Sequence, residues 1–135
     1  MATLTPTLTL NSSDAFSDTL NFSVTDSLTT KAPSQSLATA VVTTTGANNI
    51  IVTANDDKQT WVFIRHTGKA ADGTTDTANH CDVELTGDVA VGTLKPLEFL
   101  FFPFCGNGSS VGVQLQAVSA SVTMEYAYWS DNTAQ

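Results

Sequence analysis

One stretch, Leu94 to Phe104, constrains the fold more than any other part of the chain. From Phe99 onward it places large apolar side chains at odd and even positions alike, interrupted only by Pro103. The run is too short to cross a bilayer as a helix, and its prolines would break a helix. A strand that is apolar on both parities has no face suited to water. The stretch therefore predicts one strand buried on both faces, preceded by Pro96 and closed by Pro103.

Segments of alternating polarity surround this aromatic strand. Thr3–Leu10 alternates Thr with Leu, which predicts a strand with one buried face, and Pro6 makes it an edge strand or an extended arm. Roughly eight or nine short strands follow this kind of pattern, with turn signals about every ten residues. Lys31–Ser34 is expected to be a loop, and Gly106–Ser110 is the strongest turn signal. No segment shows helical periodicity over three turns.

This pattern predicts an all-β fold, a β-sandwich or jelly roll of antiparallel strands. We expect an extended N-terminal arm or edge strand over residues 1–18 and a β-sandwich domain over residues 19–130. Residues 131–135 are expected to form a polar, frayed tail. A chain of 135 residues is long enough to bury a single core without metal or disulfide staples.

Charge excludes several classes of partner. Asp and Glu outnumber Lys and Arg by 13 to 5, for a formal net charge of -8. Nucleic-acid binding depends on Lys and Arg that neutralise phosphates, and anionic lipid attracts the same residues, so we expect neither nucleic acid nor membrane as a partner. Only 13% of the residues are charged, so Ser, Thr, Asn and Gln make up most of the polar surface. The desolvation cost of a Thr-rich, weakly charged face is small when a partner displaces its water, because few charges lose their hydration.

The first residues lack the basic and continuous apolar regions of a signal peptide, which predicts synthesis in a cytoplasm. In that compartment Cys81 and Cys105 are expected to be reduced, partly buried thiols. Their number makes no disulfide framework, and the sequence leaves open whether they pair.

The candidate chemistry is sparse. His66 and His80 lie near Cys81 and several aspartates, but no His-x-His, Cys-x-x-Cys or His-Glu-x-x-His spacing is present, so no metal site is predicted. The two histidines are better interpreted as hydrogen-bonded residues that flank the exposed loop Gly68–Asn79. At roughly a dozen residues this loop is long for a compact domain, which makes it a candidate contact loop. Its candidate contact residues are Lys69, Asp72, Asp76 and His80.

The sequence likewise has no motif for a catalytic nucleophile or for an acid-base pair. No Gly-x-Ser-x-Gly is present, and Cys105, next to an apolar strand, is expected to be buried, protonated and inert. Glu98 is expected to accept hydrogen bonds from backbone donors at its turn, and Glu125 to face solvent or a partner, rather than to form a catalytic pair. No catalytic, cofactor-binding or metal-binding residue is predicted, and the chain is not expected to be an enzyme.

Two tryptophans remain. Trp61 is expected to pack in the core. Trp129 stands on the opposite parity from Tyr126 and Tyr128, and either core packing or a partner contact accounts for it. The candidate interface residues are Leu4, Leu8, Leu10 and Trp129.

The second half of the chain resembles a known class of proteins. The motifs, over about Thr60–Trp129, are Trp61-Val62-Phe63-Ile64-Arg65-His66-Thr67-Gly68, then Val83-Glu84-Leu85, then Leu94-Lys95-Pro96-Leu97-Glu98-Phe99 through Phe102-Pro103, and a closing Glu125-Tyr126-Ala127-Tyr128. In this order they resemble small virion structural proteins of tailed bacteriophages, particularly marine ones. Leu97 stands where that class has Gly, and His66 stands where it has Asn.

The resemblance implies a β-sandwich or jelly roll that decorates or cements a capsid, often as a trimer, with no catalytic residues or cofactors. The expected partners are the major capsid protein and further copies of the chain. The expected location is the capsid surface of a virion, after synthesis in the host cytoplasm. The alternative is a tail or head-fibre component that binds a receptor or carbohydrate, and a small jelly-roll enzyme is a third, less supported hypothesis.

Overall fold

The computed structural model describes residues 2–15, 17–46, 49–53, 58–106 and 111–134. The all-β prediction is confirmed: these residues form eleven strands and no α-helix. Three strands, of 15, 13 and 13 residues, are much longer than the short strands expected. The strands are β1 (Ala2–Leu4), β2 (Thr7–Ser12), β3 (Leu20–Thr25), β4 (Leu28–Val42), β5 (Ile50–Val52), β6 (Lys58–Ala70), β7 (Cys81–Leu85), β8 (Val89–Leu94), β9 (Phe99–Cys105), β10 (Val113–Ala117) and β11 (Val122–Ala134).

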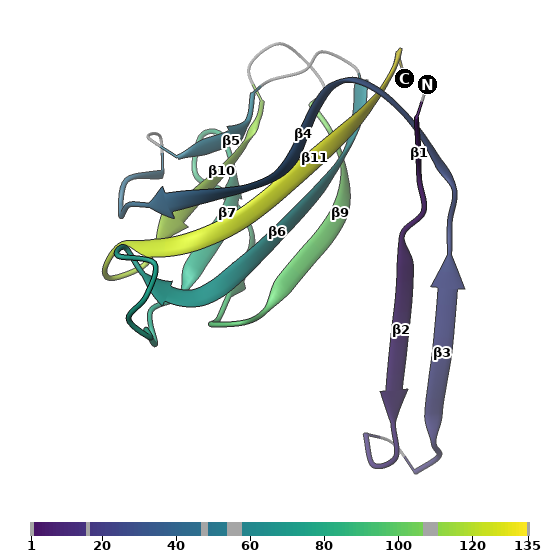
Figure 1. The fold of residues 1–135 in the computed structure, drawn as a ribbon, viewed down its shortest axis with the longest axis horizontal. Helices are drawn as coiled ribbons and strands as arrows, with labels where there is room; N and C mark the ends of the chain where they lie inside the picture. The colour runs from purple at the N-terminus through teal and green to yellow at the C-terminus, as the bar shows by residue number, and fades with distance from the viewer. Residues whose placement is uncertain (1, 16, 47–48, 54–57, 107–110, 135) are drawn as a thin grey trace.

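Two curled antiparallel sheets enclose the core (Figure 1). One has five strands in the order β1-β4-β11-β6-β9, and the other has four in the order β5-β10-β7-β8. Fully buried side chains come from both sheets, for example Ile64 and Met124 from the first and Val83 and Leu115 from the second. Removing this apolar surface from water is the main force that holds the two sheets together.

Strands β2 and β3 form a third, two-stranded sheet that projects from the body (Figure 1). We call this element, residues 7–25, the arm hairpin. Its register, from Thr7 opposite Thr25 to Ser12 opposite Leu20, continues the register of β1 on β4. Between the two ladders the amide of Asp26 donates to the carbonyl of Pro6 at 3.1 Å. The boundary expected after residue 18 therefore falls inside the hairpin.

The aromatic strand is β9, and it lies at the edge of the five-stranded sheet, paired with β6. Its even positions face inward: Phe104 is buried, and Phe102 packs against the core. Its odd positions face outward, where Phe99 is 61% exposed and Phe101 is 37% exposed. The prediction of burial on both faces is thus wrong for the single chain, and the strand continues through Pro103 to Cys105.

Two other local expectations are also wrong. Lys31–Ser34 is not a loop, because β4 runs through it. In the β4–β11 register, Trp129 pairs with Ser34 and Ser130 pairs with Lys31, so Pro33 falls in a bulge where no ladder donor is needed. The polar tail is not frayed over its described length, since β11 reaches Ala134 and pairs there with β6. The turn expected over Gly106–Ser110 lies mostly at 107–110, outside the described residues.

Candidate interaction surface

The arm hairpin has one apolar face. Leu8 lies opposite Val24, and Leu10 lies opposite Phe22. Directly paired residues share a face of a sheet, so these four side chains form one stripe. They are between 43% and 50% exposed, a large fraction for side chains of this kind. The stripe contains the predicted interface residues Leu8 and Leu10.

Two members of the stripe were missed as interface candidates. Phe22 and Val24 alternate with Asn21 and Ser23, and that alternation indicates a strand with one apolar face. The sequence pattern alone assigns this strand to the body. Leu4, the third leucine of the predicted interface, is half-buried in β1.

The opposite face of the hairpin is polar. The hydroxyls of Thr7 and Thr25 are 2.9 Å apart across the two strands, and those of Thr9 and Ser23 are 3.2 Å apart. Such cross-strand hydroxyl pairs stabilise a hairpin on its solvent-exposed polar face. The hairpin therefore has two chemically distinct faces.

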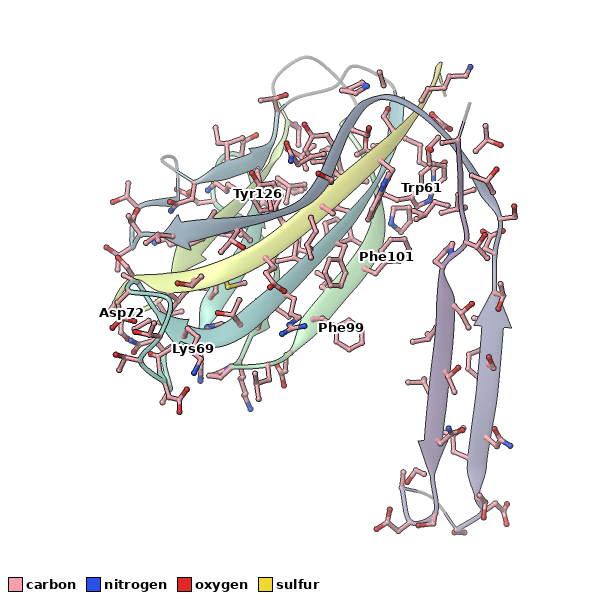
Figure 2. All side chains as sticks on the ribbon, in the orientation of Figure 1. Trp61, Lys69, Asp72, Phe99, Phe101 and Tyr126 are labelled. Carbon is pink, nitrogen blue, oxygen red and sulfur yellow. The ribbon has the colours of Figure 1, made fainter. Side chains whose placement is uncertain are left out.

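A second apolar surface lies on the outer side of β6 and β9. The register places Trp61 opposite Pro103 and Phe63 opposite Phe101, with Phe99 at the end next to Arg65. We call these five apolar residues, Trp61, Phe63, Phe99, Phe101 and Pro103, the aromatic face. Figure 2 shows Trp61, Phe101 and Phe99 along the side of the body that looks toward the arm hairpin.

Trp61 is therefore not a core residue, as the sequence had suggested, but a half-buried member of the outer surface. Trp129 in β11 lies directly opposite Trp61 and is also half-buried. The indole of Trp129 extends the aromatic face onto the next strand of the sheet.

A cleft separates the base of the hairpin from the aromatic face. One part, of about 300 Å³, is lined by Pro6, Thr7, Leu8, Phe63, Phe99 and Phe101. An adjoining part, of about 330 Å³, includes Val24 together with Trp61 and Pro103. Leu10 and Phe22 line neither part, so the outer half of the hairpin stands clear of its own body.

The candidate contact loop after β6 is held by its own hydrogen bonds. The Nζ atom of Lys69 lies 2.6 Å from an Oδ1 of Asp76, and the amide of Thr77 donates to the carbonyl of Gly68. The carboxylate of Asp72 accepts from the Thr75 hydroxyl and from the amides of Thr74 and Thr75, which holds the pKa of that carboxyl well below its usual range. The polar groups of the loop are thus largely used to order the loop itself.

Of the four residues predicted for the loop, the structure brings only Lys69 and Asp76 together. Asp72 lies at the exposed turn, as Figure 2 shows. His80 is half-buried just before β7. They do not converge on a common point that a small ligand would occupy.

His66 anchors the base of the same loop. It is fully buried, its Nδ1 accepts from the amide of Gly68 at 2.9 Å, and its Nε2 lies 3.0 Å from the carbonyl oxygen of Asn79. This pattern requires the neutral ring with its proton on Nε2. Burial lowers the pKa of His66, and the nearby His80 adds to the effect. The interpretation of His66 as a hydrogen-bonded structural residue agrees with these contacts.

The remaining candidates for chemistry are dispersed. Cys81 is buried, and burial raises the pKa of its thiol to about 12. Cys105 is exposed at the end of β9, so the expectation of a buried Cys105 is wrong, and both thiols are free. Glu98 accepts from the amide of Lys95 at 2.8 Å, in the structural role expected for it. Glu125 pairs with Arg65 at 3.5 Å.

Within the described ranges, no three His, Cys, Asp or Glu side chains gather where they could hold a metal ion. No helix in the same part of the chain is long and apolar enough to span a membrane. No family model, curated protein or solved structure matches the chain.

Proposed function

We propose that the chain is a non-enzymatic structural protein of a phage virion, a capsid decoration (cement) protein. In this role it binds the lattice of the major capsid protein and associates with copies of itself, with a trimer as the expected symmetry. The observation that supports the role is the outward display of two apolar surfaces, the arm hairpin and the aromatic face, by a chain of only 135 residues. Exposed apolar patches of this kind usually mark sites of protein association.

The nature of the polar groups supports the same role. The carboxylates of Glu98 and Asp72 accept hydrogen bonds from their own turns, and those of Glu125 and Asp76 pair with cations of the same sheet or loop. His66 is held in its neutral form by two backbone partners. Groups used in this way stabilise the fold. A stable fold that exposes apolar surfaces is suited to attachment to a capsid. The motifs over Thr60–Trp129 that resemble phage virion proteins point to a capsid as that shell.

The test is co-sedimentation of the purified protein with capsids assembled from the major capsid protein of the same phage. We expect saturable binding at a ratio set by the lattice. Binding should persist at high salt, because salt screens charge pairs and leaves apolar contacts in place. We also expect decorated capsids to withstand heating better than bare ones. Absence of binding to both mature and immature capsids would contradict the role.

A second candidate, a tail or head-fibre component that binds a receptor or carbohydrate, is favoured by one observation. Trp61 and Trp129 are neighbours on the outer side of the five-stranded sheet and both are partly exposed. Indole rings offer flat apolar surfaces on which sugar rings stack. A glycan array that shows binding by the native protein and none by Trp129→Ala would favour this candidate over the capsid role.

A further inference from the structure

The arm hairpin lacks a cover on its apolar face. An isolated two-stranded hairpin is at best marginally stable in water and normally packs one face against other structure. Here the paired residues Leu8, Leu10, Phe22 and Val24 are each left roughly half exposed. An element this long, held at one end and apolar along one side, is suited to lie on a second apolar surface.

The body of the same chain provides such a surface but does not close it. Only the base of the hairpin, at Leu8 and Val24, lines the clefts against the aromatic face. Phe99, at the far end of that face, is the most exposed of its aromatic residues at 61%. Within one chain, the apolar stripe of the hairpin and the aromatic face thus leave each other largely uncovered.

We infer that the arm hairpin of one copy docks on the aromatic face of a second copy, so that copies exchange arms in a closed assembly. The strands that carry the two surfaces match in length, because the six-residue strands of the hairpin and the seven-residue β9 each extend over roughly 20 Å. The two surfaces also match in chemistry, since each presents aliphatic or aromatic side chains from two adjacent strands. Docking in this way covers Leu10 and Phe22, which the chain's own body does not reach.

The distribution of charge favours one orientation of the docked arm. The tip of the hairpin carries Asp14 and Asp18, both exposed. Three of the five cations of the chain, Arg65, Lys69 and Lys95, lie on β6 or just before β9, at the end of the aromatic face marked by Phe99. Arg65 pairs with Glu125 and Lys69 pairs with Asp76, so this region is closer to neutral than the chain as a whole, whose net charge is -8. The acidic tip meets less repulsion there than over the rest of the surface.

The area involved explains why exchange should be mutual. A fully exposed aromatic side chain presents on the order of 150–250 Å², and Leu and Val present less. One docked arm, with the surface it covers, therefore removes on the order of 500 Å² from water. A specific interface usually needs about 1,000 Å². One docked arm falls short of that size, whereas two copies that each give and receive an arm reach it. In a closed dimer one interface holds both docked arms; in a closed trimer each copy gives one arm and receives one across two separate interfaces, so every copy again has both surfaces covered.

The connection to the body allows the hairpin to reach a neighbour. The strand ladder is interrupted between β1 and β2 at Thr5–Pro6 and between β3 and β4 at Asp26–Ser27. The bond from the amide of Asp26 to the carbonyl of Pro6 joins the two sides there. A change of direction at this joint redirects the arm without disturbing the core of the body.

Sedimentation velocity of the full chain over a range of concentrations measures the exchange. We expect the native protein to form a dimer or trimer. Val24→Ser on the hairpin and Phe99→Ser on the aromatic face should each raise the dissociation constant by about tenfold or more. Val91→Ser is the matched control: Val91 is 44% exposed on β8 of the other sheet, against 50% for Val24, and its variant should assemble like the native chain. Unchanged far-UV spectra show that each variant is folded.

An engineered disulfide tests directly whether the two surfaces meet. Val24→Cys places a thiol at the base of the hairpin, and the native Cys105 is exposed on β9. With an added oxidant we expect a covalent oligomer on a non-reducing gel, lost in the double variant Val24→Cys with Cys105→Ser. Three results would overturn the exchange. The native chain could be monomeric at all concentrations, the oligomer could survive both Val24→Ser and Phe99→Ser, or the disulfide could form only within one chain.

Arm exchange is a part of the proposed assembly role, yet it is measured without any capsid, so the two are tested separately. A monomer that binds capsids overturns the exchange and leaves the capsid role standing. An exchanged oligomer with no affinity for capsids does the reverse.

Discussion

Acidification from pH 7 to pH 5.5 should destabilise the protein through one buried side chain, His66. Its Nδ1 accepts a hydrogen bond from the amide of Gly68, and its Nε2 lies at hydrogen-bond distance from the carbonyl of Asn79. A second ring proton would sit on Nδ1 and point at the Gly68 amide, so the charged ring loses a bond and gains a repulsion. Burial lowers the pKa of His66, the hydrogen bond to the Asn79 carbonyl raises it, and the neighbouring His80 lowers it, so that the net shift is downward.

The sign and the size follow from proton linkage. In the unfolded chain His66 takes up a proton near pH 6.5, whereas the folded protein resists it, so the free energy of unfolding falls as the pH falls below about 6.5. For one group that stays neutral in the folded state, the loss between pH 7 and pH 5.5 reaches at most about 1.3 kcal/mol. The loss continues until the pH reaches the lowered pKa of the folded state. The base of the loop after β6 should be the first part to loosen, because His66 joins its two ends.

Urea denaturation at the two pH values measures the difference in the native protein and in His66→Gln. The glutamine keeps one acceptor and one donor but does not titrate, so we expect a variant that is less stable at pH 7 by about 1–2 kcal/mol and nearly insensitive to this pH change. If the variant does not fold, the NMR titration of the His66 ring in the native protein decides the matter. A native stability that is equal at both pH values, or a His66 ring that titrates near pH 6.5, would refute the reasoning.

Three further predictions concern the turns and the thiols. Leu97 has a positive φ of 73° and is 69% exposed, so Leu97→Gly should raise the free energy of unfolding by about 1 kcal/mol in urea titrations, and a decrease would contradict this. Gly68→Ala should lower it by about 1–2 kcal/mol, because φ is +78° there and an added Cβ would lie 3.1 Å from the Leu97 side chain; an unchanged midpoint would count against the packing described. In dilute native protein a thiol reagent should modify Cys105 alone, with Cys81 reacting only after unfolding, and two fast-reacting thiols would show that Cys81 is not enclosed.

The strand content could be predicted from alternation alone, and the reason is physical. A strand exposes every second residue, so Thr3–Leu10 and Leu20–Thr25 reveal their conformation through their own side chains. What alternation does not encode is which strands pair. Leu20–Thr25 pairs with Thr7–Ser12 outside the body, and nothing in its composition distinguishes that position from one inside the core.

The aromatic strand illustrates the same limit. Apolar residues on both parities indicate that both faces of Phe99–Cys105 meet apolar surface, but they do not indicate that the covering surface belongs to the same chain. In the structure one face packs on the core and the other is open. Pro33 was equally ambiguous: a proline interrupts a regular ladder, yet a bulge in β4 accommodates it with no break in the strand.

The candidate site was predictable in part. The sequence points to Leu8 and Leu10 because they stand in a simple Thr-Leu alternation, whereas the apolar neighbours of Trp61 predict a core residue. Its actual position depends on the parity of β6, in which Val62 and Ile64 are the inward residues. That parity is settled only once the opposite sheet is in place.

The hydroxyl pairs between β2 and β3 disfavour the stacking of further chains on the polar side of the arm hairpin. The side of the ribbon that carries Thr7, Thr9, Ser23 and Thr25 is already hydrogen-bonded across the strands and solvated. A further chain stacking on that side would have to dehydrate hydroxyls and would gain little apolar contact in return. Copies that join through the apolar stripe would therefore turn the hydroxyl side outward, where a solvated surface disfavours further stacking on that side.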